Sequence, residues 1–279
     1  MNGLFITGTG TEIGKTYVAA LIAKQLRDAG VRVGVYKPVA SGCSTANGEL
    51  VAEDAVALWE AAGRPLSLDA VCPQRFAAPL APPLAAAAEG KQIDEDALRC
   101  GADVWRDACD FLIVEGAGGL MSPLSQDEYN ADLALDLGLP LVVVAPNRLG
   151  VIHDTLTTVI TASVIDSMRT DRELRVAGVV LNDVAPRDTR NGCDESRASN
   201  AAQIADRVGP PLLGCVAYGG GFGRVVDWLA VAENSRRDAE TQRGRYQSSC
   251  RGHSEAKSPG ESGDGLWKCR SDPQGKDLI

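Results

Sequence analysis

Short apolar runs alternate with longer amphipathic stretches over the first 231 residues of this 279-residue chain. The apolar runs have the length of strands and consist mainly of valine, isoleucine and leucine: Leu4–Thr7, Val31–Tyr36, Phe111–Val114, Leu141–Ala145, Val176–Leu181 and Leu212–Val216. Between them, apolar positions recur with the helical period at about residues 16–29, 51–62, 95–108, 128–137, 153–168 and 197–208. Continuous apolar strands separated by helices are typical of a parallel sheet covered on both faces. The pattern therefore predicts an α/β fold with a doubly wound, mostly parallel sheet.

The composition changes after Glu233. Residues 235–279 are rich in Arg, Ser, Gly, Glu and Gln and contain no valine. Such a segment cannot bury enough apolar surface to offset the entropy lost on ordering. We therefore predict one folded domain over residues 1–233 and a disordered tail over residues 234–279. A frameshifted or otherwise aberrant end of the coding sequence would have the same composition, and the sequence does not separate the two.

Charge and cysteine content exclude several classes of protein. The formal net charge of −9 argues against a surface that binds nucleic acid or anionic membranes. The eight cysteines include no CxxC pair, so we expect reduced thiols rather than a zinc site. The first residues lead straight into the apolar run Leu4–Thr7 without a basic region, and apolar stretches such as Pro140–Pro146 are too short to span a bilayer. We expect a cytoplasmic protein.

A glycine-rich loop follows the first predicted strand. It reads Gly8-Thr9-Gly10-Thr11-Glu12-Ile13-Gly14-Lys15-Thr16 and leads into the first helical pattern. In this arrangement the backbone N–H groups and the helix dipole cradle phosphate oxygens. Lys15 is expected to pair with the β- and γ-phosphates, and the Thr16 hydroxyl to ligate Mg²⁺. The loop is a variant of the strict P-loop motif, because Thr9 stands where the first glycine is usual.

Charged and polar residues follow three other predicted strands. Ligands of open α/β sheets bind beyond the carboxyl ends of the strands. Lys37, followed by Pro38, is therefore expected to lie over the phosphate loop, and Glu115 to supply a second anchor for Mg²⁺. Two further residues are less specific. Asp54 is explained equally well as an acid in the first turn of a helix, and Asn182 as a turn residue after its strand.

Six segments of the chain resemble the dethiobiotin synthetase family, in the family's order, over about residues 1–218. They are Thr7–Thr16, Tyr36–Val39 with Ser41-Gly42, Glu53-Asp54, Ala78–Ala86, Val114–Gly119 and Arg148–His153. The resemblance implies a P-loop NTPase-like fold and an ATP- and Mg²⁺-dependent reaction of 7,8-diaminononanoate with CO₂ or bicarbonate. One amine forms a carbamate, the carbamate takes the γ-phosphoryl group, and the second amine closes the ureido ring of dethiobiotin.

The resemblance also implies a role for particular residues of this chain. The catalytic residues are Thr11, Lys15 and Lys37, and the Mg²⁺ ligands are Thr16, Asp54 and Glu115. ATP is bound by Glu12, Ile13, Gly14, Lys15, Thr16, Tyr17, Asp54, Glu115, Gly116, Ala117, Gly118 and Asn182, the last of which reads adenine. The other substrate is bound by Ser41 and by Gly150, Val151, Ile152 and His153, which hold its distant carboxylate across a homodimer interface.

Alternative functions come from the same superfamily. Partition-type ATPase switches usually carry an extra lysine near the start of the loop, where this chain has Gly8 and Thr9. Amidoligases of the cobyrinate diamide synthase type carry a glutaminase domain, for which no room remains after Val216. Two departures from the dethiobiotin synthetases also remain. The segment Val216–Gly221 lacks the proline and aromatic residue that the family often has near adenine, and beyond about Ala232 the chain matches nothing in the family. A third alternative is a damaged, inactive copy marked by an aberrant tail.

We predict that a chain cut after Ser235 keeps its fold and its catalytic activity nearly unchanged. The removed residues have few apolar side chains to pack on the domain, and every residue assigned to the site precedes them. Thermal unfolding and turnover of the full and shortened chains test this. A shortened chain that no longer unfolds cooperatively would show that the tail contributes to the structure.

Overall fold

The computed structural model describes residues 1–168, 172–186 and 194–235. Its centre is a six-stranded sheet in the order β10-β9-β8-β1-β7-β2, in which every neighbouring pair is parallel. The strands are β1 Gly3–Gly8, β2 Val33–Tyr36, β7 Phe111–Glu115, β8 Leu141–Pro146, β9 Val176–Asn182 and β10 Leu212–Val216. All six predicted strands are confirmed, with end points that differ by no more than two residues.

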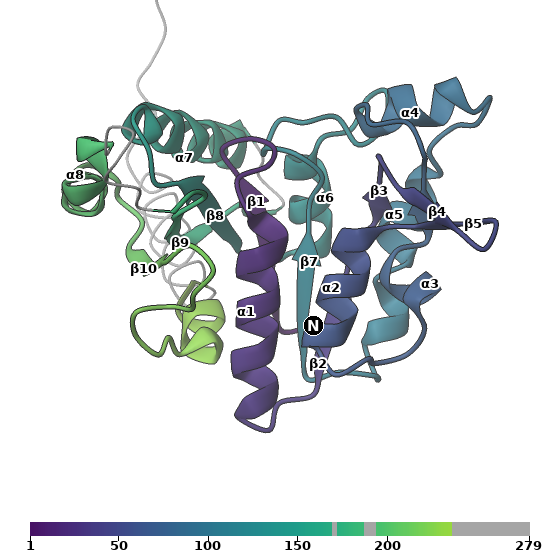
Figure 1. Cartoon of the computed structure of the whole chain (residues 1–279), viewed down its shortest axis with the longest axis horizontal. Helices are drawn as coiled ribbons and strands as arrows, with labels where there is room; N and C mark the ends of the chain where they lie inside the picture. The colour runs from purple at the N-terminus through teal and green to yellow at the C-terminus, as the bar shows by residue number, and fades with distance from the viewer. Residues whose placement is uncertain (169–171, 187–193, 236–279) are drawn as a thin grey trace, which may run out of the picture. The chain divides into compact units, whose positions relative to one another are not determined.

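Helices cover both faces of this sheet, as the apolar pattern predicts. The chain moves from β1 to β2 in one direction across the sheet, and from β7 through β8 and β9 to β10 in the other. Because crossovers between parallel strands are right-handed, the two directions place their helices on opposite faces. Figure 1 shows α1 (Lys15–Asp28) and α2 (Glu53–Ala61) in front of the strands. The opposite face carries α6 (Asn130–Leu137), α7 (Val151–Met168) and α8 (Asn200–Arg207).

Several short elements between β2 and β7 are absent from the sequence prediction. They are β3 Val39–Ala40 paired with β6 Gln74–Arg75, the hairpin β4 Ser44–Ala46 and β5 Glu49–Val51, and the helices α3 Leu68–Val71 and α4 Pro82–Ala88. Elements of two to seven residues contain too few turns or alternations to show a period. Three of them, β3, β4 and β5, matter for the site because they lie between Lys37, directly after β2, and Asp54 at the start of α2.

The predicted helix over residues 95–108 is wrong as one element. The structure has α5 over Glu95–Cys100 and then a separate 3₁₀ turn over Asp103–Trp105. The break lies at Gly101, where a Cβ atom would stand 2.3 Å from the hydroxyl oxygen of Tyr36. That hydroxyl donates to the Ala97 carbonyl at 2.8 Å. The predicted helix over 197–208 is divided in the same way, into a 3₁₀ turn over Glu195–Ala198 and the later α8.

A helix over residues 228–235 follows the last strand and continues through Glu233. Trp228 is only 2% exposed, its ring centroid lies 5.2 Å from that of Phe222, and its indole Nε1 donates to Gln25 of α1 at 2.7 Å. This helix is therefore part of the folded domain. The predicted tail over 234–279 lies outside the described residues apart from its first two. Of the helices that are described, none has the length and apolar character needed to cross a bilayer.

We predict that Trp228→Ala lowers the free energy of unfolding by roughly 3–5 kcal/mol, because it removes a buried aromatic side chain and leaves a cavity. Val225→Ala is the matched control, since Val225 lies three residues away and is 89% exposed. Denaturant unfolding of both variants beside the parent chain measures the difference. Equal stability of the two variants would contradict the packing of this helix on α1.

Candidate functional site

The loop between β1 and α1 is held open by tertiary contacts as well as by its own sequence. Gly14 has a φ of +84°, a left-handed conformation that favours glycine. A Cβ atom at Gly14 would lie 2.1 Å from the side-chain nitrogen of Asn182, which donates to the carbonyl of Ile13 at 2.9 Å. The amide of Thr9, the residue that departs from the strict motif, donates to Val144 of β8 at 3.1 Å. The loop is therefore anchored to two neighbouring strands.

Lys15 lies within this loop. Its ammonium donates to the carbonyl of Gly10 at 2.7 Å, and the residue is 7% exposed. Burial lowers the pKa of Lys15, and the negative charge of Glu115, which acts in the opposite direction, only partly offsets this effect. Lys15 and the loop amides thus form one cationic cradle at the N-terminus of α1, which is the geometry expected for binding phosphates.

Four elements bring together Thr16 of α1, Lys37 directly after β2, Asp54 of α2 and Glu115 of β7. The Lys37 ammonium donates to Oε1 of Glu115 at 2.7 Å and to Oδ2 of Asp54. The Thr16 hydroxyl donates to the same Glu115 oxygen at 2.8 Å. Lys37 and Glu115 are buried, whereas the Asp54 side chain is 52% exposed. The four predicted residues therefore form one cluster beside the P-loop.

The charges of this cluster support one another. Burial alone would lower the pKa of Lys37, but the carboxylates of Glu115 and Asp54 outweigh burial and raise it above its ordinary value. Burial would raise the pKa of Asp54, but the charge of Lys37 and its hydrogen bond to Asp54 outweigh burial and hold that pKa below its ordinary value. Lys37 and Asp54 are therefore both charged at neutral pH. Among the described residues, the second oxygen of Glu115, Oε2, is buried without a hydrogen-bond partner.

The loop after β7 is positioned by Asn130, a residue that the sequence analysis missed. Asn130 is fully buried at the start of α6. Its side chain accepts from the amide of Ala117 at 3.1 Å and donates to the carbonyls of Ala117 and Gly119 at 2.7 and 2.8 Å. Asn130 thereby fixes the small residues that follow Glu115. An asparagine in the first turn of a helix has an ordinary local explanation, so no sequence signal distinguishes it.

A cavity of about 340 Å³ lies at the carboxyl ends of β8, β9 and β10, and its lining includes Asn147, Asp183, Arg197, Ala217 and Gly221. Asn182 precedes Asp183, and its side-chain oxygen is buried without a hydrogen-bond partner in the described part of the chain. The hydroxyl of Tyr17 donates to the carbonyl of Gly220 at 2.5 Å, which ties the glycine-rich segment after β10 to α1. The predicted residues Tyr17 and Asn182 thus lie beside this segment and the P-loop, respectively.

The remaining predicted residues belong to other loops. Ser41 follows β3, next to Gly42, whose amide donates to the carbonyl of Ala78 at 3.0 Å. Gly150 has a φ of +95° and immediately precedes α7, which begins at Val151. Within the described residues, no hydrogen bond or ion pair joins residues 150–153 to the P-loop cluster. The structure therefore brings together Thr16, Lys37, Asp54 and Glu115, which the sequence predicts for ATP and Mg²⁺, but it does not bring residues 150–153 of the same chain to them.

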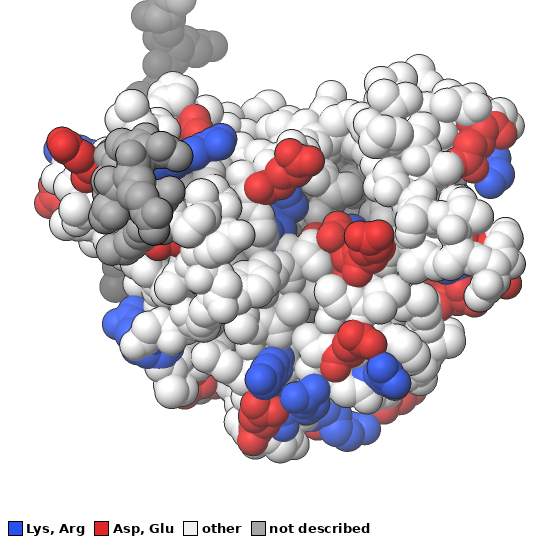
Figure 2. All heavy atoms as spheres, in the orientation of Figure 1, with Lys and Arg blue, Asp and Glu red and all other residues white. Residues whose placement is uncertain are grey.

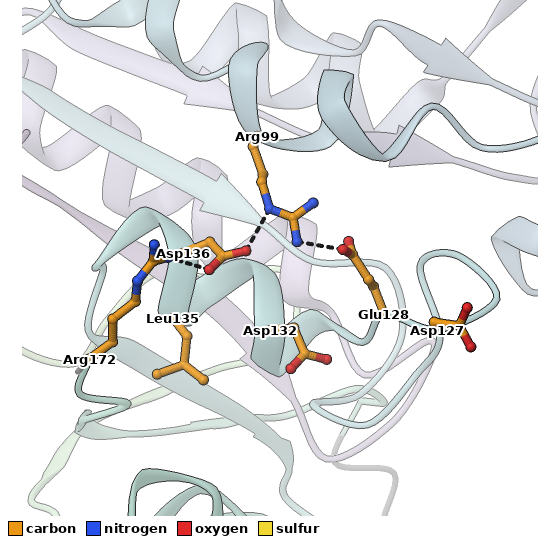
Figure 3. Close-up of a pocket in the computed structure, with 7 residues that line it drawn as sticks. All are labelled: Arg99, Asp127, Glu128, Asp132, Leu135, Asp136 and Arg172. Atoms are coloured by element: carbon orange, nitrogen blue, oxygen red, sulfur yellow. Dashed lines mark hydrogen bonds and ion pairs between the residues drawn. The ribbon is translucent and has the colours of Figure 1, made fainter. Parts of the chain in front are cut away.

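Charged residues border the site on the face shown in Figure 2, where they gather beside the loop between β1 and α1 and over the start of α2, next to a hollow. A second charged hollow, of about 380 Å³, is lined by arginines and carboxylates that pair with one another (Figure 3). In it Arg99 pairs with Glu128 and Asp136, and Arg172 pairs with Asp136. These pairs connect α5 to α6 and to the loop before α6. Because these charges compensate one another, we take the P-loop as the candidate functional site.

Comparison with known proteins agrees with this geometry. The family described as AAA domain matches residues 2–221. The ATP-dependent dethiobiotin synthetase BioD of Rhodopirellula baltica is 43% identical over 223 residues, which cover 76% of this chain and 82% of the relative. The enzyme of the same name from Anaeromyxobacter dehalogenans is 42% identical over 205 residues, covering 74% of this chain and 85% of the relative.

Among solved structures, a chain of the MinC:MinD cell division complex of Aquifex aeolicus covers 86% of this chain at 13% identity, with a TM-score of 0.46. The sequence matches are much closer, and they span most of each relative. On these matches, the chain belongs to the ATP-dependent dethiobiotin synthetase family.

Proposed function

We propose that this protein converts 7,8-diaminononanoate, CO₂ and ATP into dethiobiotin, ADP and phosphate. The observation that carries the proposal is the buried cluster of Lys37, Glu115 and Asp54 beside Thr16 and the P-loop. The two sequence relatives described above carry the name of this activity, and neither is named as an amidoligase or a partition ATPase. The reaction needs charge neutralisation between two anions, ATP and a carbamate, and the cluster concentrates suitable groups at that place.

The residues of the cluster fit a magnesium ion. Mg²⁺ prefers hard oxygen ligands and usually takes one or two carboxylates together with substrate phosphates. Thr16, Asp54 and Glu115 would hold it, and the unpartnered Oε2 of Glu115 is a ligand atom already desolvated for this purpose. When bound, the ion neutralises charge on the β- and γ-phosphates. The Lys37 ammonium bonds to the carboxylates of Asp54 and Glu115. It is therefore within reach of an anion that binds between these carboxylates and the P-loop.

The residues of this chain then have distinct tasks in the reaction. The carbamate oxygen attacks the γ-phosphorus, and the bond from that phosphorus to the β-γ bridging oxygen breaks, so ADP leaves. The second amine then attacks the carbamoyl carbon and phosphate leaves as the ring closes. Lys15 stabilises the β- and γ-phosphates, Lys37 stabilises the carbamate and the transferring group, and Thr11 and Ser41 donate hydrogen bonds to these anions. Glu12, Ile13 and Gly14 contribute the loop backbone.

The nucleoside end of ATP is proposed to lie toward the cavity at the ends of β8, β9 and β10. Asn182 adjoins this cavity through Asp183 and contacts the P-loop through Ile13. The free oxygen of the Asn182 amide is an acceptor suited to the exocyclic amine of adenine. The family often has a proline and an aromatic residue in this segment. In this chain the hydrogen bond from the Tyr17 hydroxyl to the Gly220 carbonyl is proposed to position the segment instead.

We further propose a homodimer in which a second copy covers α7. Ile160, Val164 and Met168 are 58%, 50% and 76% exposed and follow one another at four-residue spacing. They form one apolar stripe on a helix whose opposite side packs on the sheet. The first turn of the same helix contains Val151, Ile152 and His153, which together with Gly150 are proposed to hold the substrate carboxylate of the partner's active site. A cytoplasmic location stays a prediction.

The two lysines give a direct test of the mechanism. Lys15→Gln should weaken ATP binding as well as turnover, because Lys15 contacts the phosphates in the ground state. Lys37→Gln should lower turnover about a hundredfold, equivalent to roughly 3 kcal/mol, with a smaller effect on ATP affinity, because its charge acts mainly in the transition state. Calorimetric titration of an ATP analogue and steady-state rates provide the comparison.

Lys24→Gln is the control for the lysine variants, since Lys24 is an exposed residue of α1. It should leave both measurements unchanged. Thermal unfolding of each variant separates loss of chemistry from loss of structure. Normal turnover by Lys37→Gln would show that Lys37 has no part in catalysis, which would contradict the proposed function.

The homodimer is tested by a charge placed in the apolar stripe. Val164→Glu should produce monomers in light scattering and should lower turnover together with dimer content, because a carboxylate cannot be buried unpaired in an interface. Val104→Glu is the matched control at a residue of similar exposure, 53%, outside α7. If the parent chain is monomeric and fully active under assay conditions, the assignment of residues 150–153 across an interface is wrong.

A further inference from the structure

The loop between β8 and α7 is held by side chains from the segment that leads into α8. Three successive residues of the loop each have a backbone group bonded to a different side chain of that segment: Asn147 to Arg197, Arg148 to Asn200, and Leu149 to Asp194. The three distances are 3.0, 3.3 and 2.8 Å. A surface loop in which three consecutive residues are each held through a backbone group is restricted in conformation.

The centre of this arrangement is buried. Asn147, Asp183 and Asn200 are 5%, 7% and 2% exposed. The side chain of Asn147 donates to Asp183 at 2.8 Å and accepts from Asn200 at 3.0 Å. Buried polar groups stabilise little compared with apolar packing, but a fully bonded network specifies geometry. These residues therefore define where the loop lies.

The same network is continuous with the P-loop. The amide of Asn147 donates to the carbonyl of Asn182 at 2.8 Å, and the side chain of Asn182 donates to the carbonyl of Ile13 at 2.9 Å. Hydrogen bonds thus run from the nucleotide loop, through the ends of β9 and β8, to the start of α7. The position of the loop before α7 is therefore coupled to the position of the phosphate cradle.

Beyond its anchors, the loop presents free donors. Within the described residues, no acceptor is assigned to the amides of Gly150, Ile152 and His153. They lie at the N-terminus of an 18-residue helix, where such groups favour an anion. The side chains that hold the loop bond to residues 147–149 and leave these three amides open.

We infer that Asp194 and Asn200 are positioning residues for the carboxylate of the diamino acid substrate. They fix the backbone of residues 147–149, and that backbone sets the direction of the free amides at the start of α7. Neither side chain touches the substrate. The inference rests on the proposed function, and it adds residues that lie outside all six motifs that carry the family resemblance.

The test compares two substrates in two variants. Asp194→Ala and Asn200→Ala should each raise KM for 7,8-diaminononanoate about tenfold, the equivalent of one misplaced hydrogen bond to a charged group, with little change in kcat or in KM for ATP. KM for the same vicinal diamine with a methyl group in place of the carboxylate should stay unchanged. A purely structural role would move both substrates equally. Ser199→Ala is the control, since Ser199 is exposed and adjacent to Asn200.

Each other outcome counts against the inference. An equal rise in KM for both substrates, or no rise for either, overturns it. Should Asn200→Ala fail to unfold cooperatively, Asp194→Ala decides the matter, because Asp194 is partly exposed and bonds to the loop independently through Leu149. If the parent protein forms no dethiobiotin from diaminononanoate, CO₂ and ATP, the proposed function itself has failed, which is distinct from unchanged selectivity in an active enzyme.

Discussion

The buried ammonium of Lys37 balances two carboxylates that reach it from different parts of the chain. Glu115 ends the central strand β7 and Asp54 begins α2, while Lys37 itself directly follows β2. Removing one partner of a buried ion pair typically costs roughly 3–5 kcal/mol, because the other charge is left without compensation. This contact therefore ties the start of α2 to the carboxyl edge of the sheet. Thr16, the last residue of the P-loop, donates to the same oxygen of Glu115 as Lys37 does, so the P-loop is joined to this contact.

Two asparagines fix the loops around the contact between Lys37, Asp54 and Glu115. Asn130 holds the backbone after Glu115, and Asn182 holds the P-loop through Ile13. An amide side chain donates and accepts at once, so it can replace the backbone partners that a loop lacks. Both are buried, where the geometry of their hydrogen bonds is strongly constrained. The loops that follow β1 and β7 are thus held in place without regular secondary structure of their own.

Helix α7 combines two of the proposed roles. Its apolar stripe offers a surface to a second copy, and its N-terminus offers amides to a carboxylate. If both proposals hold, dimer formation and recognition of the distal end of the substrate are one event, and the phosphate site of one chain works with the amides of its partner. The network around Asn147 then joins the two functions within each chain, since it runs from the P-loop to the start of this helix.

The α/β class, the six core strands and the loop Gly8–Thr16 can be predicted from the sequence alone, because they depend on apolar runs and on a local motif of nine consecutive residues. The sequence also indicated Lys37 and Glu115, since parallel strands deliver their carboxyl ends to one edge. Three features are visible only in the folded chain: Lys37 pairs with both Asp54 and Glu115, α5 ends at Gly101 beside Tyr36, and a further helix packs through Trp228. Each of these depends on residues from 17 to 203 positions apart. Such contacts arise from packing in three dimensions, and neither periodicity nor residue type along the chain encodes them locally.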